Sequence, residues 1–411
     1  MQRDNNIPKG YKPSPFGPIP IDWDIKKGED VALKITKGSS PNWQGFQYQD
    51  EGVLFVTSEN VRDGYLDVNN PKYLPIEFND KLKNSVLKKG DILINIVGAS
   101  IGRSCIYNID TLANINQAVC LFRPNSDFNL SYLSNFLNFP KSIDRLLNTQ
   151  SDSARPNLTL EDIRNFPFIL PSRHEQTAIA NLLSTWDKAI NTLTQLIAQK
   201  ELRKKWLMQQ LLTGKKRLRG FEKNEWKKLG AGEVFKSVSI KGNLTEQLLS
   251  ATQDKGMIPR DMLEARVTMP TGDTGGFKLV EIGDFVISLR SFQGGLEYSY
   301  YRGLVSPAYT VLKPKVTIND EFYKYYFKSY DFIGHLSIAV IGIRDGKNIS
   351  YDDFCTVKIP YPTFEEQTAI ATVLQSADAE LNLFRQKLDK LKEQKKGLMQ
   401  VLLTGKKRLK F

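Results

Sequence analysis

The sequence predicts an α+β protein with two tandem, strand-rich domains, each followed by a long helix, and the two helices packed as an antiparallel coiled coil with pseudo-twofold symmetry. Three observations support this prediction. The phrase "LMQQLLTGKKRL" at residues 207–218 recurs as "LMQVLLTGKKRL" at 398–409, with one letter changed. Apolar residues before each phrase recur in steps of three and four, which keeps one apolar seam along a supercoiled helix. The remaining segments contain short apolar runs bounded by glycine and proline, as strands do.

The duplication extends well beyond the repeated phrase. "EQTAIA" at 175–180 is identical to 366–371, and at the same offset "NLTLED" at 157 aligns with "NISYDD" at 348. Upstream, "KKGDILI" at 88–94 matches "EIGDFVI" at 281–287 more weakly. A period this long indicates a duplicated domain rather than a solenoid. The predicted division is a first domain at 1–166, a first helix at 167–221, a second domain at 222–357 and a second helix at 358–411.

Each long helix has a recognisable start and end. Ser172 with Glu175, and Thr363 with Glu366, have the spacing of a capping box, in which a hydroxyl caps the helix and a carboxylate three residues later bonds back. The residues predicted to end the helices in the left-handed conformation are Gly214 and Gly405. The "KKR" after each glycine is interpreted as a solvated helix end that suits the helix dipole, in preference to a phosphate contact.

The composition favours a polyanionic partner. Lys and Arg number 57 against 45 Asp and Glu, which gives a net charge of +12. Many basic proteins bind no nucleic acid, so charge alone does not identify the partner. No apolar run approaches the roughly 18 residues that cross a bilayer, and the first twenty residues lack the apolar core of a secretory signal. We therefore expect a cytoplasmic protein without membrane association.

Polar loops between the predicted strands carry side chains suited to base edges and phosphates. Arg and Lys bind guanine, Asn and Gln bind adenine, and the same groups also bind phosphate. For any single residue, an ordinary polar surface position is the competing interpretation. The candidate DNA-binding residues of the first domain are Lys34, Lys37, Ser39, Trp43, Gln44, Arg103, Asn116, Gln117, Arg155 and Asn157. Those of the second domain are Arg290, Gln293, Tyr298, Tyr301, Arg302, Arg344, Lys347 and Asn348.

The sequence contains no motif for catalysis. It has neither the glycine-rich cofactor loop nor the base-holding motif of a DNA methyltransferase, and no GxxxxGK[ST] loop of an ATP-driven motor. Its two histidines, His174 and His335, and three well-separated cysteines fit neither a zinc site nor a catalytic triad. We therefore predict no catalytic residue, metal site or bound cofactor in this chain.

These features together resemble the specificity subunits of type I restriction–modification systems. The resemblance covers nearly the whole chain. It rests on the alternation of divergent domain and repeated helix, on the G-D-I/F strands, and on the repeated "LLTGKKRL". It also rests on the P-x-x-x-E-Q helix openings, formed by Pro171, Glu175 and Gln176 and by Pro362, Glu366 and Gln367.

The resemblance implies that the two domains are target recognition domains, each reading one half of a bipartite, asymmetric sequence in double-stranded DNA. It also implies that the helices set the spacer and dock two modification subunits, which carry S-adenosylmethionine and methylate adenine N6, and that restriction subunits join this core. The specificity subunit itself is expected to be non-catalytic. The side chains expected to dock the modification subunits are Glu175, Gln176, Leu207, Leu211, Glu366, Gln367, Leu398 and Leu402.

Two other classes of protein fit part of the pattern. A stand-alone, dyad-symmetric DNA-binding regulator would share the geometry, but it would bind its site tightly without partners. A coiled-coil scaffold would join two proteins and carry its basic charge incidentally. Its binding would change little with salt, whereas DNA binding weakens steeply as salt rises.

Overall fold

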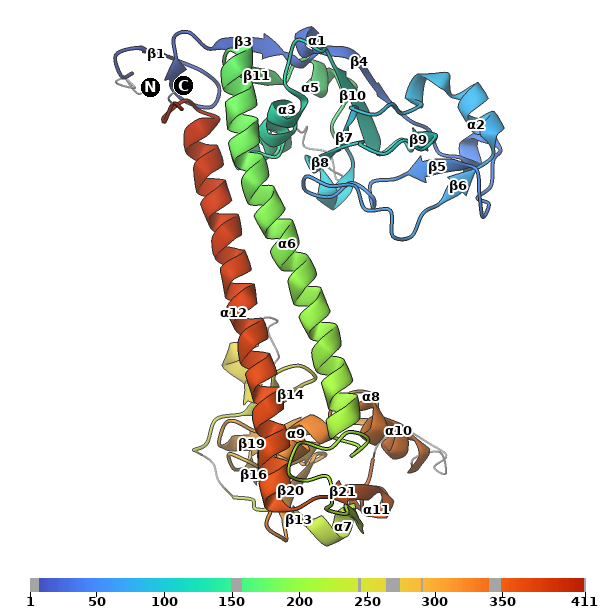
Figure 1. The fold of residues 1–411 in the computed structure, drawn as a ribbon, viewed down its shortest axis with the longest axis vertical. Helices are drawn as coiled ribbons and strands as arrows, with labels where there is room; N and C mark the ends of the chain where they lie inside the picture. The colour runs from blue at the N-terminus through green and yellow to red at the C-terminus, as the bar shows by residue number, and fades with distance from the viewer. Residues whose placement is uncertain are drawn as a thin grey trace. The chain divides into compact units, whose positions relative to one another are not determined.

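The computed structural model describes residues 7–148, 157–242, 245–263, 274–289, 291–339 and 349–409. The chain forms two compact units (Figure 1). Unit 1 comprises Met1–Leu193 and Lys387–Phe411, and unit 2 comprises Thr194–Gln386. Both boundaries fall inside the long helices α6 (Arg173–Leu211) and α12 (Phe364–Leu402). The predicted boundaries kept each helix whole, whereas the compact units share each helix, because each unit packs a strand-rich domain against one end of both helices.

The centre of the unit 1 domain is a four-stranded antiparallel sheet. Its order is β4 (Ala32–Lys37), β10 (Val119–Pro124), β7 (Ile92–Asn95) and β8 (Ser104–Ile106). A smaller sheet has the order β6 (Tyr73–Leu74), β5 (Val53–Val56) and β9 (Ala113–Ile115), with β5 parallel to β9. The two-stranded pairs are β1 (Tyr11–Lys12) with β2 (Ile19–Pro20), and β3 (Asp24–Lys27) with β11 (Pro167–Leu170).

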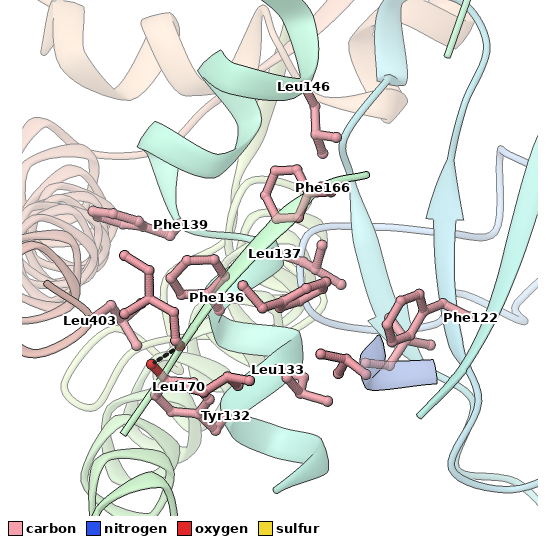
Figure 2. Close-up of a cluster of buried hydrophobic side chains, with 14 of the residues drawn as sticks. Phe122, Tyr132, Leu133, Phe136, Leu137, Phe139, Leu146, Phe166, Leu170 and Leu403 are labelled. Carbon is pink, nitrogen blue, oxygen red and sulfur yellow. Dashed lines mark hydrogen bonds between the residues drawn. The ribbon is translucent and has the colours of Figure 1, made fainter. Parts of the chain in front are cut away.

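Short helices cover the sheet and complete the core of unit 1. They are α1 (Gly28–Val31), α2 (Ile76–Lys81), α3 (Leu130–Leu137), α4 (Pro140–Asn148) and α5 (Leu160–Arg164), with 3-10 turns η1 (Asn42–Gln44), η2 (Lys83–Ser85) and η3 (Gly98–Ser100). Phe122, Phe136 and Phe166 pack in a buried aromatic cluster, with Leu403 from beyond α12 at its margin (Figure 2). Tyr132 donates its hydroxyl to the Ile169 carbonyl at 2.8 Å, which satisfies the one polar atom of this buried ring.

Unit 2 repeats this framework. Its four-stranded sheet has the order β13 (Phe235–Val238), β20 (Thr310–Pro314), β17 (Phe285–Ile287) and β18 (Glu297–Tyr298). The paired strands are β12 (Lys227–Gly230) with β21 (Lys358–Tyr361), β14 (Leu249–Thr252) with β15 (Gly256–Pro259), and β16 (Lys278–Val280) with β19 (Gly303–Val305). Its short helices are α7 (Ala231–Val234), α8 (Ser291–Gly294), α9 (Asp320–Tyr326), α10 (Tyr330–Ala339) and α11 (Tyr351–Thr356), with the 3-10 turn η4 (Arg260–Met262).

Within each unit the two long helices are antiparallel, as predicted. In unit 1 the start of α6, with Ile179 and Leu183, shares a core with Leu402 and Leu403 at the end of α12. In unit 2 the end of α6, with Leu211, shares a core with the start of α12. The ion pair Lys395–Asp187 of unit 1 has the counterpart Lys204–Asp378 in unit 2. The two units therefore repeat the same contacts with the roles of the helices exchanged.

The predicted helix ends are also confirmed. The Glu175 amide donates to the Ser172 hydroxyl at 3.3 Å, and the Glu366 amide donates to the Thr363 hydroxyl at 3.4 Å. Gly214 and Gly405 follow the helices with φ of 71° and 67°, in the left-handed region that favours glycine.

Candidate nucleic-acid interface

One end of the four-stranded sheet in unit 1 brings together loops from distant parts of the sequence. β4 and β7 end there, at Lys37 and Asn95, and β10 and β8 begin there, at Val119 and Ser104. The register confirms this, since Lys37 pairs with Cys120 and Asn95 pairs with Val119. Segments 38–46, 96–103 and 116–118 leave these strand ends, and we call them the loop edge of unit 1.

Six of the predicted DNA-binding residues lie on the first and third of these segments or beside them. Ser39, Trp43 and Gln44 follow β4, and Gln44 Nε2 donates to Ser39 Oγ at 3.0 Å. Trp43 is 76% exposed, although it is a large apolar side chain. The other three of these residues are Lys37, which is exposed, and Asn116 and Gln117, which are half-buried.

The third segment is tied to the first and carries an unsatisfied polar atom. The Gly38 amide donates to the Asn116 carbonyl at 3.2 Å, and Asn116 Oδ1 accepts from the Ala118 amide at 3.1 Å. Gln117 Oε1 is buried without a hydrogen-bond partner. A water or a ligand can satisfy such an atom.

Two more predicted residues border the second segment of the loop edge. Arg103 Nε lies 3.7 Å from Asp63 Oδ1 in an exposed ion pair. Asn157 forms an isolated β-bridge with Val97, which places it beside this segment. Eight predicted residues of the first domain therefore lie at one edge, as a shared binding surface requires.

Lys34 does not belong to this group. It pairs with Arg123 in the register of β4 and β10, away from the loop edge, and its Nζ lies 3.5 Å from Asn84 Oδ1. Burial lowers the pKa of Lys34 from its ordinary value, and the adjacent Arg123 lowers it further. Lys34 and Lys37 lie on the same strand, but only Lys37 reaches the edge.

The repeated G-D motif has a structural role in both units. Asp91 is buried and accepts two hydrogen bonds from Arg123, at 2.6 and 2.7 Å, and a third from the Lys88 amide at 2.7 Å. In unit 2 Asp284 accepts from the Glu281 amide at 2.8 Å and pairs with Lys313 at 3.1 Å. The motif thus fixes the turn before a central strand, and the likeness between the copies here reflects folding.

Among the described residues of unit 2, one predicted residue follows a strand at the corresponding edge. Gln293 lies exposed on α8, in the connection that follows β17. Tyr301 and Arg302 follow β18, at its other end, where Arg302 pairs with Glu246 at 2.8 Å and Glu281 at 2.9 Å. The candidates Arg155, Arg290, Arg344, Lys347 and Asn348 lie outside the described residues.

Tyr298 is a core residue, which corrects its assignment as a DNA contact. It is 7% exposed and packs edge-on against Phe285. Its hydroxyl donates to Asp320 Oδ2 at 2.5 Å. Burial, followed by this hydrogen bond, raises the pKa of Tyr298 above its ordinary value. The strand periodicity that puts Phe285 in the core also puts its cross-strand partner Tyr298 there.

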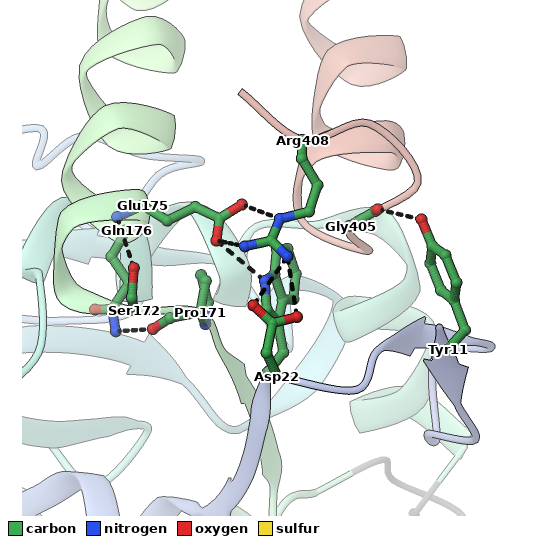
Figure 3. A network of polar contacts seen from close by, with 9 residues as sticks. Tyr11, Asp22, Pro171, Ser172, Glu175, Gln176, Gly405 and Arg408 are labelled. Carbon is green, nitrogen blue, oxygen red and sulfur yellow. Dashed lines mark hydrogen bonds and ion pairs between the residues drawn. The ribbon is translucent and has the colours of Figure 1, made fainter. Parts of the chain in front are cut away.

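A buried carboxylate joins the ends of the two helices in unit 1 (Figure 3). Glu175 is 1% exposed and accepts hydrogen bonds from Arg408 Nε at 2.9 Å and Nη2 at 2.7 Å. The Trp23 indole donates to the same carboxylate at 3.2 Å. Arg408 also pairs with Asp22 at 2.9 Å, and the Tyr11 hydroxyl donates to the Gly405 carbonyl at 2.9 Å. These contacts tie the N-terminal strands to the segment after α12.

Unit 2 contains the same cluster. Glu366 is fully buried and accepts from Arg217 Nε at 2.7 Å and Nη2 at 2.6 Å, and from the Trp226 indole at 2.9 Å. The capping-box prediction is therefore wrong for both carboxylates, which bond to a distant tryptophan and arginine. The lysines of each "KKR" are exposed, as the interpretation of a solvated helix end expects, whereas Arg217 is half-buried and both arginines pair with a buried glutamate.

The structure also corrects the docking role predicted for six side chains. Gln176 and Gln367 are buried and accept from the Asn129 amide at 2.9 Å and the Asn319 amide at 2.7 Å. Leu211 and Leu402 belong to the hydrophobic cores, as Glu175 and Glu366 belong to the buried clusters. The four polar side chains lie at the start of a helix, whereas Leu211 and Leu402 attach the end of each helix to the domain of the other copy. Leu207 and Leu398 are half-buried beside the same cores.

A family model described as the type I restriction modification DNA specificity domain matches residues 20–202 and 223–393. The chain belongs to this family. The two matches cover the two duplicated halves, so the strand-rich domains are the two recognition domains of a type I specificity subunit. The four-stranded sheets and their loop edges are therefore parts of recognition domains.

Some similar proteins match nearly the whole length of this specificity subunit, and others match part of it. A putative type I restriction enzyme MjaX specificity subunit from Methanocaldococcus jannaschii is 24% identical, over 98% of this chain and 97% of its own. The EcoBI specificity subunit of Escherichia coli is 31% identical over 166 residues, which are 39% of this chain and 34% of its own. A crystal structure of the S subunit from M. genitalium is 15% identical, covers 98% of both chains and has a TM-score of 0.53.

A second similar chain comes from a solved structure that concerns complex assembly and conformational transition of the type I R-M system. This chain is 18% identical, covers 94% of the present chain and 99% of its own, and has a TM-score of 0.60. At this level of identity both structures show a common fold.

One segment of the first recognition domain borders the loop edge although its sequence was not predicted to bind DNA. Residues 57–67, "TSENVRDGYLD", lie against the loop edge, since the Gly64 amide donates to the Ser104 carbonyl at 2.9 Å. The Asp63-Gly64 dipeptide is a turn signal that marks such a loop in the sequence. In the part of the chain that the structure describes, no helix is long and apolar enough to cross a membrane, and no cluster of three metal-ligating side chains occurs.

Proposed function

We propose that this chain is the DNA-reading subunit of a type I restriction–modification complex, with each recognition domain reading one half of a bipartite, asymmetric target. The observation that carries the proposal is the combination of a repeated framework with dissimilar loops. Both units have the same sheet order, the same buried aspartate motif and the same Glu–Arg–Trp cluster. The segments that follow the equivalent strands β7 and β17 differ in sequence, "IVGASIGR" against "SLRSFQGG", as the reading of two different half-sites requires.

The loop edge of unit 1 offers the chemistry of major-groove readout. Asn116, Gln117 and Gln44 supply the paired donor and acceptor that adenine N6 and N7 require, and Arg103 supplies the fork that fits guanine. Lys37 provides a positive charge for the backbone phosphates. The exposed Trp43 ring provides an apolar contact for a thymine methyl group or a base step.

The repeated helices provide equivalent sites for two modification subunits. These partners carry S-adenosylmethionine and methylate adenine N6, and restriction subunits join through the same core. The exposed positions of the repeat, such as Lys215 and Lys216 with their counterparts Lys406 and Lys407, support this arrangement, because two identical partners need two similar surfaces. In this complex the chain itself binds and orients the DNA, and the chemistry belongs to its partners.

A genome-wide map of N6-methyladenine tests this proposal in cells that express the chain with its cognate modification subunit. The expected result is a two-part asymmetric motif that disappears when this chain is deleted. Replacing residues 222–357 with another second recognition domain should change only one half of the motif. An active partner without any new motif contradicts the proposal, and tight, salt-sensitive DNA binding by the chain alone then favours a stand-alone regulator.

A further inference from the structure

The segment Thr57–Asp67, which we call the Arg62 loop, is the first part of the connection between β5 and β6 and contains several internal hydrogen bonds. Asn60 holds it together, because its Oδ1 accepts from the Thr57 amide at 2.8 Å and its Nδ2 donates to the Asp67 carbonyl at 2.8 Å. At the tip, the Arg62 amide donates to the Tyr65 carbonyl at 3.0 Å. Gly64 has φ of 83°, which permits the tight reversal. The loop therefore presents a fixed tip of Arg62, Asp63 and Tyr65.

Asn95 attaches this loop to the loop edge. Asn95 is fully buried at the end of β7, and its Nδ2 donates to the Ser58 carbonyl at 2.9 Å. The same Nδ2 lies 3.1 Å from Ser100 Oγ, in the segment that carries Arg103. One buried amide thus fixes the Arg62 loop and segment 96–103 to each other. Preorganised groups lose less entropy on binding, which favours selective recognition.

Arg62 and Arg103 each form an ion pair with a different aspartate near the tip of the Arg62 loop. Arg103 pairs with Asp63 at 3.7 Å, and their side chains are 41% and 72% exposed. Arg62 pairs with Asp67 at 3.6 Å, and their side chains are 42% and 25% exposed. The Arg62–Asp67 pair is half-buried, and Asp67 Oδ1 also accepts from the Asn69 amide at 3.2 Å. The Arg103–Asp63 pair is more exposed, and exposed ion pairs are weak. Tyr65, which is 56% exposed, adds an aromatic face beside the two pairs.

We propose that the Arg62 loop is part of the DNA-reading surface of the first recognition domain and that Asp63 and Asp67 are specificity determinants. This inference rests on the proposed function. Arg62, Arg103 and Tyr65 contact the first half-site. The two carboxylates neutralise the arginines in the absence of target and repel the phosphates of other DNA.

The different chemistry of base edges and backbone phosphates explains this selectivity. Guanine offers O6 and N7 at the spacing of the guanidinium fork, so a correctly placed base replaces the carboxylate with two hydrogen bonds. A non-target duplex offers mainly phosphates, which gain affinity only through neutralisation of charge. A carboxylate beside each arginine weakens this non-specific attraction at every site, whereas the specific bonds compensate for it at the target. Removing the carboxylate should therefore strengthen binding to the wrong DNA most.

The test uses the complete methyltransferase complex, with the chain and its modification subunits, and duplexes derived from the mapped methylation motif. One duplex carries the whole target, and two others each have one half-site scrambled. The variant is Asp63→Ser, since serine keeps the turn-forming character of the position. The matched control is Asp110→Ser, because Asp110 and Asp63 are 77% and 72% exposed and Asp110 pairs with Lys89, at 2.7 Å, at the opposite end of β7 and β8.

We expect Asp63→Ser to tighten binding to the duplex with a scrambled first half-site by about threefold to tenfold. The slope of the logarithm of this binding constant against the logarithm of the salt concentration should become more negative by about one. Discrimination against changes in the second half-site should not alter. Asp110→Ser should leave both quantities unchanged. Arg103→Lys, which keeps the charge but loses the fork, should reduce affinity for the whole target by about tenfold while non-specific binding persists.

The outcomes separate this inference from the function on which it rests. If Asp63→Ser matches Asp110→Ser in salt dependence and half-site discrimination, the inference is wrong, and the proposed function stands as long as the wild-type complex prefers its motif. If the wild-type complex shows no preference for any motif, both fail. A purely structural role for Asp63 would lower affinity for all three duplexes together, and that result also overturns the inference.

Discussion

Within each unit, a buried carboxylate paired with an arginine connects segments that are distant in sequence. Glu175 and Glu366 lie at the first turn of a long helix, and each accepts from an arginine and a tryptophan that are distant in sequence. A buried charge is tolerated only when its partners remain, so the loss of one partner costs more than the pair contributes over an apolar replacement. These positions should therefore be more sensitive to substitution than exposed acidic residues nearby.

Glu366→Ala should lower the free energy of unfolding by about 3 kcal/mol or more, because it leaves the Arg217 guanidinium, with 17% of its side chain exposed, without its carboxylate. The neighbouring Glu365 is exposed, and Glu365→Ala should change this free energy by less than about 0.5 kcal/mol. Chemical denaturation followed by tryptophan fluorescence measures both. Equal effects of the two variants would contradict a stabilising role for the cluster.

A second buried carboxylate makes unit 2 sensitive to pH. Burial raises the pKa of Glu297 to about 7, although Lys328 at 2.7 Å lowers it. The native state therefore binds this proton more tightly than the unfolded state does. The stabilisation from the protonated form is present at low pH and is lost as the pH rises through about 7.

Glu297→Gln should therefore raise the thermal midpoint of the protein at pH 8, and the difference from wild type should shrink toward pH 5. Thermal unfolding of both proteins across this range measures the effect. Glu225→Gln, at an exposed position of the same unit, serves as the control and should leave the pH profile unchanged. A constant difference between wild type and Glu297→Gln at all pH values would exclude the titration of this group as the cause.

At the scale of elements, the ends of the long helices are alike in backbone but differ in their surroundings. A Cβ on Gly214 would lie 3.1 Å from the Trp226 ring, whereas a Cβ on Gly405 would lie 2.3 Å from Pro20 Cδ. Both glycines have a positive φ, so alanine strains the backbone at both positions. Only at Gly405 does the added carbon also require a proline ring to move.

Gly405→Ala should therefore destabilise the protein more than Gly214→Ala, for which we expect a loss of about 1 kcal/mol. Equilibrium unfolding of the two variants tests this order. Gly397→Ala provides a control, because Gly397 lies within α12 with open space around its Cβ, and alanine there should stabilise the helix by about 0.5–1 kcal/mol. A larger loss of stability for Gly214→Ala than for Gly405→Ala would show that the Pro20 ring moves at little cost in free energy.

At the scale of the whole molecule, unit 1 is assembled from two separate stretches of the chain, whereas unit 2 is one continuous stretch. The second stretch of unit 1 contributes Leu402, Leu403 and Arg408 to the core and the buried cluster. Contacts within unit 1 thus depend on residues that lie after the whole of unit 2 in the sequence.

Deleting residues 403–411 should loosen unit 1 and leave unit 2 intact. Hydrogen–deuterium exchange measured by mass spectrometry should show faster exchange of the amides in 173–193 and little change in 194–212. The matched substitution Arg217→Ala should have the opposite pattern, because Arg217 belongs to the cluster of unit 2. An equal change in amide exchange in 173–193 and 194–212 after the deletion would contradict the assignment of these two segments to different units.

Sequence periodicity and local signals are sufficient to predict the long helices, their hydroxyl caps and their terminal glycines, because neighbouring residues determine these features. They are insufficient for Glu175, since its partner Arg408 lies 233 residues away and the local pattern equally suits a capping box. They also do not separate Lys34 from Lys37. The order and register of the strands decide which lysine reaches the loop edge, and no local pattern contains that order.

The composite nature of unit 1 has a consequence for its biosynthesis. During translation the ribosome releases every residue of unit 2 before Leu402, Leu403 and Arg408 become available to unit 1. Until then the nascent chain holds Ile179 and Leu183 without the leucines that complete their core, and Glu175 without Arg408, although Trp23 is already available to this carboxylate. The domain that is made first is therefore completed last, and during that interval its open core is the surface that chaperones and proteases encounter.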